Sequence, residues 1–189
     1  MDLVLEGIIM VKQIMIIRHG EKPKNGKKGI LSSGKKNIES LIVKGWIRAG
    51  ALSEMFRTGQ RNLFTPTKLY ACFKSEHTQR ALETIKPLSE ILHIPINKNV
   101  QRGDEKLMAK LAKESDGVVL ISWEHDCIHL IANEIVDKTL VPQKWPNNRY
   151  DMIYVFTLGD NEKYTFSQVP QLVLKGDLDT PFKVIDKNI

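Results

Sequence analysis

Apolar residues recur along the chain in short runs that alternate with stretches of helical periodicity. Four runs rich in β-branched side chains are each short enough for one buried strand: residues 13–17, 68–73, 117–123 and 152–158. Apolar residues at helical spacing fill four intervening or following stretches: residues 41–56, 76–92, 104–113 and 126–136. Strands that alternate with helices predict an α/β fold with a largely parallel sheet.

The last third of the chain has a different pattern. Residues 150–158 and 163–169 are separated by a turn sequence at 159–162, which predicts an antiparallel hairpin at the edge of the sheet. No repeat, linker or low-complexity block interrupts the chain. We therefore expect one domain over residues 13–189, preceded by an extension over residues 1–12, for which disorder and a partial strand both stay open.

Composition indicates an ordinary globular protein. The chain has 189 residues, of which 42% are hydrophobic and 26% charged, enough to bury a core. Its two cysteines, Cys72 and Cys127, lie in apolar stretches and suggest buried thiols rather than disulfides. Residues 1–12 carry Asp2 and Glu6 without a basic leader, and no apolar run approaches the roughly 20 residues of a membrane helix. We expect a cytoplasmic protein that does not bind membranes.

Positive charge is concentrated in one segment of the chain. The net charge is +6, and one stretch holds six lysines: Lys22, Lys24, Lys27, Lys28, Lys35 and Lys36. No aromatic residue lies between Lys22 and Lys44, so this stretch lacks the stacking side chains typical of nucleic-acid binding. Because the stretch directly follows a candidate catalytic segment, we expect Lys24, Lys27 and Lys28 to attract an anionic substrate and lower its KM.

Basic side chains follow three successive predicted strands. The first strand ends in Arg18, His19 and Gly20, Arg80 lies one turn into the helix after the second strand, and His125 follows the third. Ligands of open α/β sheets bind beyond the carboxyl ends of the strands. The sequence therefore predicts that Arg18, His19, Arg80 and His125 meet at one edge of the sheet.

These residue types suit phosphoryl transfer. A guanidinium binds two phosphate oxygens at once, and a helix N-terminus adds backbone donors for an anion. A neutral imidazole attacks phosphorus and forms a covalent intermediate, which divides one difficult displacement into two easier ones. We expect His19 to be the nucleophile, and Arg18, Arg80 and His125 to hold the phosphate oxygens.

The chain resembles the histidine phosphatase superfamily, also called the phosphoglycerate-mutase-like family. The resemblance rests on the Arg-His-Gly segment at residues 18–20, on Gly45, on the Ser-x4-Arg-Ala-x2-Thr pattern of residues 75–84, and on His125. Residues 149–151, 169–171 and 175–177 look like the ending of small bacterial members. The resemblance implies a three-layer αβα sandwich, a phosphohistidine intermediate on His19, a phosphate pocket of Arg18, Arg80 and His125, and no metal or cofactor.

Two departures from the family pattern affect the expected chemistry. Mutases carry a Ser and an Asn shortly after the Arg-His-Gly segment, whereas this chain has Glu21, Lys22 and Pro23, so a hydrolase is favoured over a mutase. The proton donor is Asp126 if it follows the acid-phosphatase pattern, or Glu105 if it follows the mutase pattern, and we favour Asp126. Glu21 is expected to orient an arginine of the pocket.

Two alternative functions stay open. His125 and His129 are one helical turn apart with Asp126 between them, a spacing close to that of zinc proteases, although no third ligand is evident and Asp126 is short for a base. A non-catalytic module could hold a phosphorylated ligand in the same pocket, but a pure anion site needs no nucleophile such as His19. The substrate is a small phosphorylated molecule or a phosphoprotein, and no pattern indicates the oligomeric state.

Overall fold

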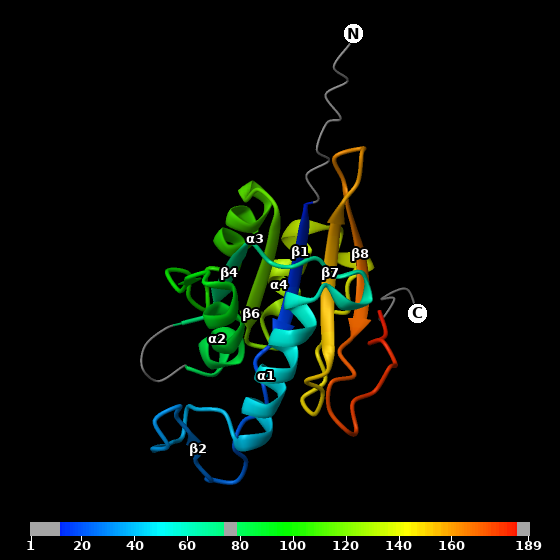
Figure 1. The fold of residues 1–189 in the computed structure, drawn as a ribbon. Helices are drawn as coiled ribbons and strands as arrows, with labels where there is room; N and C mark the ends of the chain where they lie inside the picture. Colours follow the sequence, from blue (N-terminus) through cyan, green and yellow to red (C-terminus); the bar gives the residue numbers. More distant parts are fainter. Residues whose placement is uncertain (1–11, 74–78, 185–189) are drawn as a thin grey trace.

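The computed structural model describes residues 12–73 and 79–184, and its centre is a six-stranded mixed sheet (Figure 1). The strands lie in the order β5 (Ile96–Asn97), β4 (Lys68–Ala71), β6 (Val118–Trp123), β1 (Gln13–Arg18), β7 (Met152–Leu158) and β8 (Tyr164–Pro170). The first four are parallel to one another, and β7 and β8 are each antiparallel to the preceding strand. This confirms the predicted α/β fold with an antiparallel C-terminal edge.

Helices cover both faces of the sheet. On one face α1 (Val43–Arg57) packs against α2 (Arg80–Leu92), and on the other α3 (Glu105–Glu114) packs against α4 (Ile128–Ile135) (Figure 1). Two short 3-10 helices follow α1 and α4, at Gln60–Asn62 and Lys138–Leu140. In the described part of the chain, no helix combines the length and the apolar character needed to cross a bilayer.

The predicted elements agree with the observed ones except near their ends. The first residues of the predicted 76–92 helix, and all but Lys12 of the predicted 1–12 extension, lie outside the described residues. Two-residue strands β2 (Gly29–Ile30), β3 (Lys36–Asn37) and β5 were not predicted, because two residues are too few to show a periodicity. That residues 13–189 form one domain stays a prediction.

Burial explains why the central strands read as continuous apolar runs. Every residue of β1 and β6 is buried, as expected for parallel strands that helices cover on both faces. The edge strand β8 alternates between partly buried and exposed residues along most of its length, since only one of its faces packs on the core. The core therefore lies along β1 and β6, between the two helical layers.

The strand register brings distant segments to one edge of the sheet. Arg18 at the end of β1 lies opposite Trp123 at the end of β6, and Ala71 at the end of β4 lies opposite Ser122. Because β7 is antiparallel to β1, the residues that precede Met152 reach the same edge. The β2–β3 hairpin hangs beyond α1 and α2 at this end of the molecule (Figure 1).

The backbone of the turn after β1 lies in close contact with α1. A Cβ atom added at Gly45 in α1 would lie 2.6 Å from the carbonyl oxygen and 2.9 Å from the amide nitrogen of Glu21. Backbone atoms cannot move away as a flexible side chain can, so this position requires glycine. The close approach fixes the path of residues 19–21, which carry the candidate nucleophile.

Candidate active site

His19 is buried directly beyond the end of β1. Its Nδ1 atom lies 2.7 Å from the carbonyl oxygen of Gly20, which only accepts hydrogen bonds, so Nδ1 carries the proton. The pKa of His19 is lowered to about 3, chiefly because the ring is buried. The positive charges of Arg18, Arg80 and Lys22 also lower this pKa, whereas the hydrogen bond to Gly20 raises it. The ring is therefore neutral at pH 7, with a lone pair on Nε2 that has no partner among the described residues.

His19 lines a small cavity together with Cys72, Arg80, Ala81 and Glu124. The cavity measures about 10 Å³, so it has room for about one water-sized atom, such as one phosphoryl oxygen. One wall is cationic and another is the carboxylate of Glu124. This places a neutral imidazole, a guanidinium and a carboxylate around one point.

Arg80 is the first residue of α2, and its side chain is bound by the segment that connects β3 to α1. Its Nη2 atom donates to Glu39 Oε2 at 2.8 Å and to the carbonyl of Ile38 at 3.1 Å. One turn into α2, the Thr84 hydroxyl accepts from the Gly20 amide at 2.8 Å and donates to the Arg80 carbonyl at 2.7 Å. Thr84 thus ties the turn that carries His19 to the helix that carries Arg80.

Arg18 points into the segment that precedes β7. Its Nη1 atom donates to three backbone carbonyls, those of Pro146, Asn147 and Arg149, at 3.3, 3.0 and 2.7 Å. The guanidinium carbon also lies 3.9 Å from the centre of the Tyr150 ring, a cation–π contact. These contacts fix the guanidinium rigidly. Sequence reasoning assigned no role to residues 146–150, although part of this segment contributed to the family resemblance.

His125 lines a second cavity, of about 280 Å³, together with Arg18 and Lys22. The remaining residues that line it are Lys24, Asn147, Asn148 and Tyr150. His125 Nε2 lies 2.8 Å from Asn147 Oδ1 and donates to it, because an amide oxygen only accepts. Burial lowers the pKa of His125, and the positive charge of Arg18 lowers it further. The hydrogen bond to Asn147 acts in the opposite direction and raises this pKa.

The four predicted phosphate-site residues thus reach the same edge of the sheet, but they line two cavities. His19 and Arg80 line one, whereas Arg18 and His125 line the other. The two cavities lie near each other, since the charges of Arg18 and Lys22, which line the second cavity, act on His19 in the first. The Nε–H groups of Arg18 and Arg80 are buried without a hydrogen-bond partner among the described residues. A buried donor without a partner costs about 1–3 kcal/mol, which an anion accepting from both would offset.

Three carboxylates lie near the site, in different surroundings. Asp126 and Glu124 bind the same guanidinium, that of Arg102, at 2.6 and 2.7 Å. Glu105 is buried and accepts from the indole of Trp123 at 3.2 Å and from the Gly103 amide at 3.1 Å. Glu105 is therefore engaged in packing, while Asp126 is half-exposed. Glu124 was not among the predicted residues, and only its place beside His125 marked it.

Glu21 makes the expected charge-assisted bond, but with a different arginine. It binds Arg48 of α1, with 2.9 Å between Oε1 and Nη2, rather than Arg18 or Arg80. Arg48 also binds Asp177 at 2.7 Å and the Gln171 side chain at 2.7 Å. Glu21 thus belongs to a buried network with Arg48, Asp177 and Gln171, which does not include Arg18 or Arg80.

Neither a metal site nor a reactive thiol is evident among the described residues around the site. Within residues 12–73 and 79–184, no group of three or more His, Cys, Asp and Glu side chains is placed to hold a metal, so the pair His125 and His129 lacks a third ligand there. Burial raises the pKa of Cys72 to about 12 and that of Cys127 to about 11. Both thiols are protonated at neutral pH and are poor nucleophiles.

Comparison with known proteins identifies the fold. No protein-family model and no curated protein matches the chain. The protein histidine phosphatase SixA complexed with tungstate is 18% identical with a TM-score of 0.56, over 84% of this chain and 97% of that one. A phosphoglycerate mutase from Plasmodium falciparum is 14% identical with a TM-score of 0.53, over 92% and 99%. A phosphoserine phosphatase variant from Entamoeba histolytica in complex with phosphoserine is 13% identical with a TM-score of 0.52, over 82% and 94%.

Proposed function

From a fold that matches members of the histidine phosphatase superfamily, we propose that the chain hydrolyses phosphomonoesters without a metal through a phosphohistidine on His19. One observation carries the proposal: His19 is buried and neutral, and its Nδ1 bond to Gly20 leaves the Nε2 lone pair free beside Arg80. The tungstate of SixA and the phosphoserine of the Entamoeba protein support a phosphate-like ligand.

The first chemical step transfers the phosphoryl group to the protein. His19 Nε2 attacks phosphorus as the bond to the ester oxygen breaks, and the imidazole becomes positively charged. The Gly20 carbonyl accepts from Nδ1–H and stabilises that charge. Arg18 and Arg80 hold phosphoryl oxygens with little reorganisation, because Pro146 and Glu39 already fix the two side chains. His125 joins them when its Nε2–H passes from Asn147 to a phosphoryl oxygen. Water then attacks the phosphohistidine, which releases inorganic phosphate and restores neutral His19.

The acid that protonates the leaving oxygen lies opposite His19, because the entering and leaving atoms are in line. Asp126 suits this position: it is half-exposed, and its charge acts on both Arg18 and His125. Glu105 is less suitable, since it is buried and accepts hydrogen bonds from Trp123 and Gly103, whereas the ion pair of Asp126 with Arg102 is exposed to solvent. We therefore propose Asp126 as general acid and then as the base that activates water.

The leaving group of the substrate tests the acid. We expect Asp126→Asn to lower kcat/KM for phenyl phosphate about a hundredfold or more, and that for p-nitrophenyl phosphate much less, because p-nitrophenolate departs without a proton. Glu124→Gln is the matched control, since it removes the other carboxylate bound to Arg102. Its effect should be the same on both esters. A leaving-group dependence in Glu124→Gln, or in Glu105→Gln, and not in Asp126→Asn would reassign the acid.

Catalysis is distinguished from binding alone by a turnover assay in the presence of a chelator. We expect the purified chain to release p-nitrophenol from p-nitrophenyl phosphate with excess EDTA present. Binding of tungstate without any release would instead support the phospho-ligand module. Release that EDTA abolishes and zinc restores would support the zinc hydrolase at His125 and His129.

A further inference from the structure

A cleft of about 540 Å³ adjoins the cavity of Arg18 and His125, and seven of the 17 residues that line it are basic. Four residues line both this cleft and the cavity of Arg18 and His125: Lys22, Lys24, Asn148 and Tyr150. A molecule held in the cavity of Arg18 and His125 therefore has a continuous path into the cleft. We call it the lysine cleft, after Lys22, Lys24, Lys27, Lys28 and Lys44, which line it.

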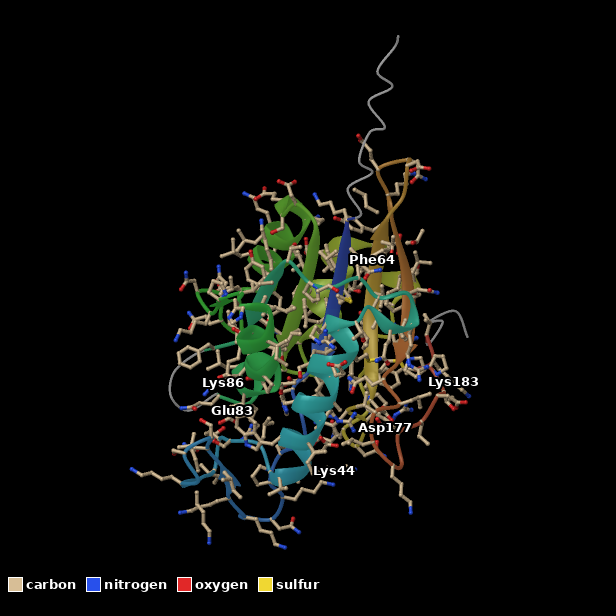
Figure 2. All side chains as sticks on the ribbon, viewed as in Figure 1. Lys44, Phe64, Glu83, Lys86, Asp177 and Lys183 are labelled. Carbon is tan, nitrogen blue, oxygen red and sulfur yellow. The ribbon has the colours of Figure 1, made fainter. Side chains whose placement is uncertain are left out.

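The lysine cleft carries uncompensated positive charge. Seven cationic side chains line it, against three carboxylates. Each carboxylate is already bound to an arginine: Glu21 and Asp177 bind Arg48, and Asp151 binds Arg149 at 2.6 Å. Among the described residues, four of the five lysines form no ion pair. The fifth, Lys44, lies in the first turn of α1 (Figure 2), 3.7 Å from the already bound Glu21.

Lys22 shows how closely like charges lie at the junction of the cleft and the phosphate site. Burial lowers the pKa of Lys22, and the charges of Arg80 and Arg18 lower it further, although Asp126 and Glu124 act in the opposite direction. A bound anion is the natural counterion for such a group of cations. The shared position of Lys22 means that one ligand can neutralise charge on both sides of the junction.

We propose that the lysine cleft binds a second phosphate group of a small-molecule substrate whose first phosphate is held at His19. The proposal rests on the proposed phosphatase function and adds a substrate class to it. The cleft volume lies in the range of sites for small ligands, whereas a protein partner would need roughly 800 Å² of surface on each side. Charged side chains outnumber the apolar and aromatic ones that line the cleft, namely Pro23, Ile42, Tyr150 and Leu178, so we expect charge to supply most of the affinity for an anion.

Two synthetic esters of one alcohol isolate the effect of the second phosphate. We compare kcat/KM for the monophosphate and the bisphosphate of hexane-1,6-diol at constant ionic strength. Two equivalent phosphates give a factor of about two by statistics alone. We expect at least about a tenfold preference for the bisphosphate, mainly through KM, since one charge-assisted contact is worth about a factor of ten.

Lysine variants locate the source of that preference. Lys27 and Lys28 line the cleft but not the cavity of Arg18 and His125, so Lys27→Met/Lys28→Met should reduce the preference to the statistical factor. The matched control is Lys35→Met/Lys36→Met, which removes two charges from the same basic stretch outside the cleft. It should retain the preference. Equal losses in both variants, or none in the first, would overturn the proposal in favour of general electrostatic attraction.

Binding measured without turnover separates this inference from the proposed function. In the His19→Ala variant, calorimetry should show at least about tenfold tighter binding of the bisphosphate than of the monophosphate, whether or not the wild type is an enzyme. Turnover without any such difference would refute the cleft and leave the phosphatase intact. An acidic phosphopeptide that binds more tightly than the bisphosphate, with the same dependence on Lys27 and Lys28, would overturn the small-molecule class.

Discussion

His19→Ala is expected to lower kcat/KM for p-nitrophenyl phosphate by at least about a thousandfold, because loss of a covalent nucleophile removes the whole two-step route. The measurement is p-nitrophenol release by purified variant and wild type. His129→Ala is the control, since His129 lies in α4 and lines neither of the two candidate active-site cavities. It should change the rate no more than a few-fold.

The phosphorylated intermediate gives a direct check on the same residue. Wild type quenched during turnover of a radiolabelled ester should carry label that is lost in acid and retained in alkali, as a phosphoramidate is. His19→Ala should carry none. Label that persists in the variant would assign the nucleophile elsewhere, and full activity of the variant would refute the mechanism.

The low pKa of His19 also predicts how stability depends on pH. The folded protein holds His19 neutral down to about pH 3, whereas the unfolded chain protonates it below about pH 6.5. The unfolded state therefore binds more protons in this window, and the contribution of His19 to stability is lost as pH falls from 6.5 towards 3. Between pH 7 and pH 5, urea unfolding should show wild type losing about 2 kcal/mol more than His19→Asn. Equal losses would mean that His19 is not held neutral.

Arg48→Ala is expected to destabilise the fold by about 3–5 kcal/mol, because it leaves buried carboxylates without their counterion. The Arg48 side chain is 2% exposed, and it binds Glu21, Asp177 and Gln171. Although burial alone lowers the pKa of Arg48, its bonds to Asp177 and Glu21 raise it above the usual value. Urea unfolding at pH 7 measures the change.

Arg57→Ala is the matched control in the same helix. Arg57 binds Glu54 at 2.7 Å, a distance as short as that between Arg48 and Asp177, but both Arg57 and Glu54 are exposed to solvent. Exposed pairs are screened by water and salt, so no measurable change in stability is expected. If the two variants lost the same stability, or if Arg48→Ala lost none, the buried network would not stabilise the connection between α1 and the C-terminal segment.

Much of the fold can be predicted from the sequence alone, because a strand that is buried on both faces is recognisable as a short, mostly apolar run. Parallel strands covered by helices are buried at every position, as β1 and β6 are, so most of their residues are apolar. The carboxyl ends of such strands share one edge, so Arg18, Arg80 and His125 could be assigned to the same edge from their positions along the chain. That assignment needed no knowledge of any particular contact.

The details of the site were decided only by tertiary structure. The carbonyls that fix Arg18 lie at least 128 residues away from it, and they reach it because β7 is antiparallel to β1. The pairing of Glu21 with Arg48 and Asp177, and the division of the phosphate-site residues between two cavities, likewise depend on which side chains pack together. The periodicity of apolar residues indicates whether a position is buried, but it does not indicate which residue that position contacts. Partners at long sequence separation are chosen by the register of the strands and the packing of the helices.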